Sequence, residues 1–301
     1  MKNPVIENTL LTLGEDYLDI WLKTFVQAKQ SENVSKKTLS FYEFTLKGFG
    51  DYANAQAVKS ISQITPTLIR EYLLHLEERK HNSGGIHAHF RALKTFMLWY
   101  WNEVEPSCPN PIKKVKSPKL IQPAIQGVTP EQFELLVSAC NTKRDKLILY
   151  ILMDTGIRAN ELVNIQLKDV NLIQSSIFIE KGKGRKPRFC FIGQKARRQV
   201  RRYLKERKSD SPYLFTNCSG EKMVFQTLRE VLRRLGTKTG LVGITAHDFR
   251  RAFCLAQLNA GCDLVTLSRL MGHTSIVLLS RYAFQSTTDI QSKYKSILDN
   301  N

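Results

Sequence analysis

Two arginines in the second half of the chain each have a partner side chain three residues away. Arg158 and Glu161 lie in TGIRANEL, and His247 and Arg250 lie in TAHDFRR. Side chains at this spacing share one face of a helix, so each pair would point the same way. Thr245 is a candidate N-cap for the second pair, and a helix N-terminus beside an Arg and a His is a good anion site. Taken singly, each pair also fits an ordinary surface ion pair or a chance spacing.

A lysine, a second histidine and a tyrosine complete the candidate set. Lys183 lies between two glycines in KGKGRKPR, and His273 follows Gly272 at the expected end of a helix. Tyr282 comes nine residues after that histidine, in MGHTSIVLLSRY. Each of these also has a plain interpretation, since turn lysines are commonly solvated and a single tyrosine is more often a core residue than a nucleophile.

Together these residue types suit phosphoryl transfer at a phosphodiester. The pentavalent transition state gains negative charge on its non-bridging oxygens, and guanidinium groups clamp such charge without a metal. A tyrosine hydroxyl can attack phosphorus and a phenolate can leave again, so a covalent intermediate would conserve the bond energy for rejoining. The sequence shows no acidic cluster at metal-ligand spacing, and the histidines near His87 lack acidic partners at such a spacing, so we expect neither metal nor cofactor.

The charge of the chain points to a polyanionic partner. Its 301 residues include 45 Lys or Arg against 27 Asp or Glu, for a formal net charge of +18. Thirteen of these cations lie in residues 181–208, where Glu206 is the one acid. A solvated helix face would also carry such a run, but its first part has the glycines and proline of a turn and its second part is helical. We therefore expect contacts with DNA phosphates from Lys181, Arg185, Lys186 and Arg188.

Nucleic acid is a better partner than a membrane for this charge. No segment approaches the roughly 18 consecutive apolar residues of a spanning helix, and MKNPVIENTL does not resemble a signal peptide. The six cysteines form no CxxC pair, which is typical of free thiols in a reducing compartment. We expect a cytoplasmic protein.

The first half of the chain reads as helices followed by a linker. Apolar residues recur at helical spacing around Trp21, after Ser35, after Thr65-Pro66, and in a fourth segment after Gly84-Gly85. Residues 106–128 then contain five prolines and four lysines without periodicity. The sequence thus predicts a helical domain over 1–110, a linker over 111–127 and a second domain over 128–301.

The second domain should contain the only strands. A helix is expected after Thr129-Pro130, and IFIE at 177–180 and FCFI at 189–192 should be two strands joined by a lysine-rich turn. Helices are expected again from there onwards, including a tail helix with an apolar stripe at Ile290, Tyr294, Ile297 and Leu298. The fold class is therefore mainly α with a small antiparallel β-sheet (α+β).

Taken in order, the candidate residues resemble the signature of the tyrosine recombinase (phage-integrase) family. TGIRANEL resembles the first arginine box of that family, GKGRKPR its lysine hairpin, HDFR its second box, and MGH with a tyrosine at plus nine its last. Arg251 stands where the family often has His, and the hairpin returns through FCFIG without a proline. All seven positions are filled between residues 155 and 282: Arg158, Glu161, Lys183, His247, Arg250, His273 and Tyr282.

The resemblance implies an architecture and partners. Residues 1–110 would be a core DNA-binding domain that closes with the catalytic domain, 128–301, as a clamp around duplex DNA. A homotetramer on two DNA sites would act through a Holliday junction, with an accessory recombination protein as a further partner. We also expect no additional arm-site DNA-binding domain before the core-binding domain, which favours an Xer-like or transposon-like member.

The resemblance also implies a role for each residue. Tyr282 would attack the phosphate to give a 3′-phosphotyrosyl link, while Arg158 and Arg250 hold its oxygens and His273 donates a further hydrogen bond. His247 would accept the tyrosine proton and Lys183 would protonate the leaving 5′ oxygen. Glu161 would orient this set. Two alternatives stay open: a type IB topoisomerase that swivels one strand, and a catalytically silent DNA-binding protein.

Overall fold

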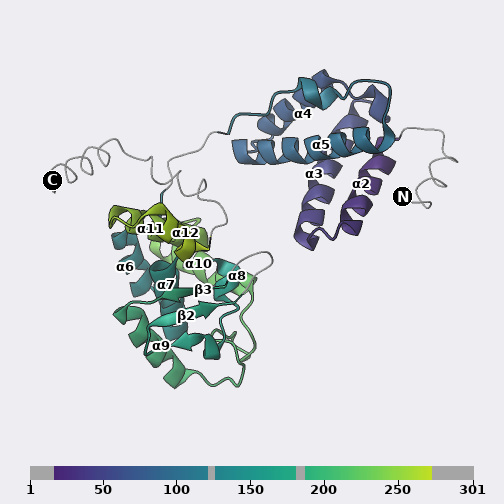
Figure 1. Cartoon of the computed structure of the whole chain (residues 1–301). Helices are drawn as coiled ribbons and strands as arrows, with labels where there is room; N and C mark the ends of the chain where they lie inside the picture. The colour runs from purple at the N-terminus through teal and green to yellow at the C-terminus, as the bar shows by residue number, and fades with distance from the viewer. Residues whose placement is uncertain (1–16, 121–125, 181–186, 273–301) are drawn as a thin grey trace, which may run out of the picture. The chain divides into compact units, whose positions relative to one another are not determined.

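The computed structural model describes residues 17–120, 126–180 and 187–272, and its contacts divide the chain into two units, Met1–Gln122 and Pro123–Asn301 (Figure 1). Within the described residues, no helix has the length and apolar character needed to cross a membrane. Each unit has a hydrophobic core of its own.

Over residues 17–120, four long helices build the first unit, and side chains cap three of them. Two of them start where the sequence predicted, after Ser35 and Thr65, whose side chains accept hydrogen bonds from the backbone N–H groups three residues later. The fourth helix starts ahead of the two glycines rather than after them, because Asn82 Oδ1 accepts the Gly85 N–H at 2.7 Å. The helices are α2 (Leu18–Ser31), α3 (Lys36–Ala55), α4 (Pro66–Glu78) and α5 (Ser83–Val104), with 3-10 turns η1 (Ile61–Gln63) and η2 (Pro111–Lys114).

Aromatic side chains fill the core of this unit. Phe25, Phe49 and Phe96 are fully buried, and α5 packs against α2, α3 and α4. His89 of α5 is part of this packing, since Tyr72 Oη and His89 Nδ1 lie 2.8 Å apart in a buried hydrogen bond. Burial lowers the pKa of His89 below its ordinary value. His89 therefore has a structural role here.

The second unit is organised around one buried helix. Helix α7 (Lys143–Thr155) packs against α6, α9 and α11, and its residues 147–152 are buried without a break (Figure 1). Thr129 caps α6 as predicted, and its N–H donates to Gln132 Oε1 at 3.0 Å. The remaining elements are α6 (Pro130–Ser138), α8 (Ala159–Leu162), η3 (Leu167–Asp169), α9 (Gln194–Glu206), α10 (Phe225–Thr239), α11 (Ala246–Asn259) and α12 (Leu264–Met271).

A three-stranded antiparallel sheet in the order β1-β2-β3 completes this unit. Strands β2 (Ser176–Ile179) and β3 (Arg188–Phe191) each begin one residue earlier than predicted, while β1 (Val170–Asn171) is too short to leave an alternating pattern. Ile179 pairs with Arg188, which places Arg188 at the first position of β3. The fold class predicted from the sequence, mainly α with a small antiparallel sheet, is confirmed.

Candidate active site

Arg158 follows a sharp turn at the end of α7. Gly156 ends that helix in the left-handed region at φ +55°, and a Cβ there would lie 2.6 Å from a ring carbon of Phe253. Two residues later, Arg158 is the N-cap of α8 and Glu161 is its third residue. The predicted shared face of this pair is therefore present at a helix start.

Arg250 is buried, with 4% of its surface exposed, and reaches two backbone carbonyls. Its Nη1 donates to the Gly156 oxygen at 2.6 Å and its Nη2 to the Met271 oxygen at 2.7 Å. It lies in the second turn of α11, which Thr245 begins as predicted, with the Thr245 N–H donating to Asp248 Oδ2 at 2.8 Å. A cation in this position is held by the main chain of two other segments.

The C-terminal end of α12 collects three arginines from three elements. The Leu270 carbonyl accepts from Arg188 Nε at 3.0 Å, and the Met271 carbonyl accepts from Arg250 and from Arg158 Nη1, the latter at 3.2 Å. The Gly272 carbonyl accepts from Arg158 Nη2 at 2.9 Å. The carbonyls at the C-terminal end of a helix carry partial negative charge, so cations bound there stabilise the helix. We call Arg158, Arg188, Arg250 and Glu161 the arginine cluster.

Glu161 is the one carboxylate of the arginine cluster. Its carboxylate accepts hydrogen bonds from Nη1 and Nη2 of Arg188 at 3.1 and 2.7 Å. It also accepts hydrogen bonds from the backbone N–H and from Nη1 of Arg158, each at 3.0 Å. Burial alone would raise the pKa of this carboxyl, but the hydrogen bonds and charge of Arg188, followed by those of Arg158, lower it to about 2. Glu161 is therefore ionised, and the cluster holds three positive charges against one negative charge.

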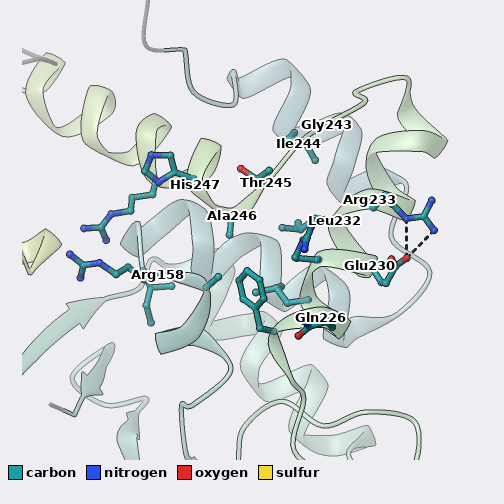
Figure 2. Close-up of a pocket in the computed structure, with 16 residues that line it drawn as sticks. Arg158, Gln226, Glu230, Leu232, Arg233, Gly243, Ile244, Thr245, Ala246 and His247 are labelled. Atoms are coloured by element: carbon teal, nitrogen blue, oxygen red, sulfur yellow. Dashed lines mark hydrogen bonds and ion pairs between the residues drawn. The ribbon is translucent and has the colours of Figure 1, made fainter. Parts of the chain in front are cut away.

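A pocket of about 600 Å³ opens beside the cluster between α8, α10 and α11. Arg158, His247 and Arg250 line one part of it, and Figure 2 shows Arg158 and His247 on the side away from the Glu230–Arg233 ion pair of α10. Partial burial, and then the positive charges of Arg251 and Arg250, lower the pKa of His247 below its ordinary value. A neutral imidazole thus lies beside two guanidinium groups.

The structure brings four of the predicted site residues together: Arg158, Glu161, His247 and Arg250. Arg188 was predicted to contact DNA. In the structure its side chain is only 8% exposed, and its guanidinium binds Glu161 and the Leu270 carbonyl inside the protein. The other predicted residues lie outside the described residues: Lys181, Lys183, Arg185, Lys186, His273 and Tyr282.

Sequence reasoning missed the α10 side of the pocket. Gln226, Arg229 and Arg233 line it from one face of that helix. Their spacing of three and four residues in QTLREVLRR was the signal that could have found them. Arg229 and Arg233 thus add positive charge to the α10 side of the pocket.

This geometry suits an anion with several oxygens. Two guanidinium groups bound to one carbonyl oxygen, that of Met271, are fixed close to each other and to a neutral histidine. Guanidinium forks match phosphate geometry, and a neutral imidazole can accept a proton. This arrangement therefore suits the binding of a phosphate ester.

Comparison with known proteins gives the family. The chain matches the phage integrase family over residues 126–288 and the phage integrase N-terminal SAM-like domain over residues 21–104. The first match alone spans more than half of the chain, so this protein belongs to the phage integrase family and is a tyrosine recombinase. The family predicted from the seven positions is confirmed.

Individual relatives match the sequence of this chain along most of their own length. The tyrosine recombinase XerA of Pyrococcus horikoshii is 28% identical over 275 residues, covering 90% of this chain and 88% of the relative. The tyrosine recombinase XerC of Staphylococcus epidermidis is 30% identical over 276 residues, covering 88% of this chain and 92% of the relative.

Solved structures share the fold. The Tn1549 transposon integrase in complex with transposon right end DNA superposes with a TM-score of 0.77 at 18% identity, covering 94% of this chain and 99% of that one. The XerH site-specific recombinase in a post-cleavage complex with palindromic difH substrate gives 0.72 at 21% identity, covering 88% and 81%.

Proposed function

We propose that this protein is a site-specific recombinase that cleaves and rejoins double-stranded DNA through a 3′-phosphotyrosyl intermediate. The observation that carries the proposal is the attachment of Arg158 and Arg250 to the same carbonyl of α12, with His247 lining the same pocket. This arrangement suits the stabilisation of charge on the non-bridging oxygens of a phosphodiester. Family membership supplies the reaction class.

In the proposed cleavage step, the Tyr282 oxygen forms a bond to phosphorus and the bond from phosphorus to the 5′ oxygen breaks. The tyrosine proton passes to His247, whose lowered pKa keeps the imidazole neutral at pH 7 and able to accept it. Lys183 gives a proton to the 5′ oxygen, while Arg158 and Arg250 hold the non-bridging oxygens. Rejoining is the same step in reverse, with a 5′ hydroxyl as the attacking group.

The remaining predicted residues keep supporting roles in this proposal. His273 follows Gly272 in the sequence, directly after the carbonyls that the arginines bind, and donates a hydrogen bond to the phosphate. Lys181, Arg185 and Lys186 contact the DNA backbone beside it. Glu161 holds Arg158, and so acts on the phosphate through that arginine.

The units have separate tasks in the proposal. Residues 1–110 are a core DNA-binding domain, 111–127 a linker and 128–301 the catalytic domain, in keeping with the SAM-like match over 21–104 and the catalytic match over 126–288. The active assembly is a homotetramer on two DNA sites in the cytoplasm, with an accessory recombination protein as a possible partner. Because the fold is shared with a transposon integrase, we expect the DNA substrate of this protein to belong to a mobile element.

A supercoiled plasmid that carries two target sites, taken from the DNA flanking the gene, tests the reaction class. We expect recombinant products. Relaxed topoisomers without recombinants would instead indicate the type IB topoisomerase alternative, and bound but uncut plasmid would indicate a silent DNA-binding protein. Either outcome contradicts the proposal.

A nicked duplex that traps the covalent intermediate tests the nucleophile. Tyr282→Phe loses only the hydroxyl, so it should bind this DNA as the unaltered protein does and form no denaturation-resistant adduct. An adduct formed by the variant would place the nucleophile at another residue.

A further inference from the structure

Arg188 links three elements that carry the site. It is the first residue of β3, yet its Nε donates to the Leu270 carbonyl at the end of α12 and its two Nη atoms bind both oxygens of Glu161 on α8. This two-point contact is the geometry in which guanidinium binds carboxylate best. The side chain is 8% exposed, so water screens the pair little.

The contact with α12 depends on glycine at its end. Gly272 has φ +59°, and a Cβ built there would lie 2.8 Å from Arg188 Nη1 and 3.2 Å from its Cδ. The Arg188 side chain therefore lies directly against the backbone where the helix stops. His273 is the next residue of the chain.

The balance of charge explains what this contact does for Arg158. Glu161 accepts hydrogen bonds from both Arg188 and Arg158, and its pKa of about 2 reflects Arg188 more than Arg158. If Arg188 were neutral, the carboxylate would have Arg158 as its remaining cationic partner in the cluster. The negative charge of Glu161 would then largely compensate the positive charge of Arg158, and a bound phosphate would experience a weaker positive potential.

We propose that Arg188 is a positioning residue that neutralises Glu161 and fixes the end of α12, so that Arg158 keeps its charge for the scissile phosphate. This inference rests on the proposed function. It assigns to Arg188 no contact with DNA, and it makes the Arg188–Glu161 pair, rather than Glu161 alone, the unit that supports the phosphate clamp.

The test measures the single-turnover rate of covalent adduct formation at saturating nicked DNA for the unaltered protein and four variants. R188Q removes the charge, R188Q/E161Q removes both charges of the pair, and R188K keeps the charge without the fork. R269Q is the matched control, because Arg269 is exposed on the last turn of the same helix α12 and also loses one positive charge. DNA affinity is measured in parallel by equilibrium binding.

We expect R188Q to form the adduct about tenfold to a hundredfold more slowly than R269Q, with DNA affinity changed far less. The double variant R188Q/E161Q should be several-fold faster than R188Q, since no carboxylate is then left to compensate the charge of Arg158. A residue that only supports the fold would not be rescued by a second loss of contacts.

Three results would overturn the inference. R188Q could be as fast as R269Q, or R188Q/E161Q as slow as R188Q, or R188Q could lose DNA affinity while keeping its rate at saturation, which would make Arg188 a DNA contact. If R188Q does not fold, R188K decides: it should stay within about tenfold of the unaltered protein, and a folded R188K that forms no adduct contradicts the charge-balancing role. Failure of the unaltered protein and R269Q to form any adduct would refute the proposed function instead.

Discussion

Glu161 should make the stability of the catalytic unit depend on pH in a window that the structure defines. Its pKa is about 2 in the folded protein against an ordinary value of 4.5. Because the folded pKa is lowered, the stabilisation is fully present above pH 4.5 and is lost as pH falls towards 2. At about 1.4 kcal/mol per pKa unit, the total is about 3 kcal/mol, of which about 2 kcal/mol should be lost by pH 3.

The assay compares urea unfolding of the unaltered protein and Glu161→Gln from pH 7 to pH 3. Trp21, Trp99 and Trp101 are the only tryptophans and all lie in the first unit, so their fluorescence follows that unit while far-ultraviolet circular dichroism follows both. The difference in free energy of unfolding between the two proteins should shrink by about 2 kcal/mol as pH falls.

Glu230→Gln provides the control. Glu230 also pairs with an arginine three residues away, but both side chains are well exposed, so the free energy of unfolding should change little at any of these pH values. A difference between Glu161→Gln and the unaltered protein that stays constant from pH 7 to pH 3 would refute the reasoning, because the carboxylate would then not owe its ionisation to the cluster.

Four further predictions concern the reaction and its assembly. Lys183→Ala should cleave ordinary DNA very slowly. It should recover most of its rate when sulfur replaces the bridging 5′ oxygen, because a thiolate leaves without a proton, whereas Arg158→Ala should not recover. Equal responses of the two variants would make Lys183 a phosphate contact only. Binding to duplex DNA should weaken steeply with salt, because residues 181–208 carry twelve cations besides the internally paired Arg188, and a flat titration would contradict this. Deleting residues 287–301 should impair assembly on DNA more than cleavage, which normal recombination by the truncated protein would disprove. Gly272→Ala should lower the free energy of unfolding of the catalytic unit by about 1 kcal/mol or more, because φ is +59° and the methyl group meets Arg188, and an unchanged thermal midpoint would count against that contact.

Local features of the fold were predictable because their causes lie within a few residues. Ser35, Thr65 and Thr129 each cap a helix through a hydrogen bond to a backbone N–H three residues on, so the sequence shows cap and helix together. The start of α5 was misplaced because the Asn82 cap outweighs the low helix propensity of the two glycines that follow it. Strand β1 was missed because two residues cannot show an alternation.

The candidate site likewise contains residues that local sequence patterns predict and one residue, Arg188, whose position they do not predict. Arg158 with Glu161, and His247 with Arg250, are recognisable because each pair occupies one helix start. The position of Arg188 could not be inferred, since its partners Glu161 and Leu270 are 27 and 82 residues away and a cation in a basic run looks like a surface residue. Its contacts follow from how β3, α8 and α12 pack, and no short motif records that packing.

The attachment of three arginines to residues 270–272 means that the arginine cluster can be completed only late in the synthesis of the chain. Chains emerge from the ribosome N-terminus first, and Arg158, Arg188 and Arg250 are all made before the carbonyls that they bind. A chain that ends before α12 therefore has its cations but lacks the three carbonyls that hold them in one place. Completion of α12 is thus required for the full arginine cluster, and the proposed nucleophile Tyr282 comes later still in the chain.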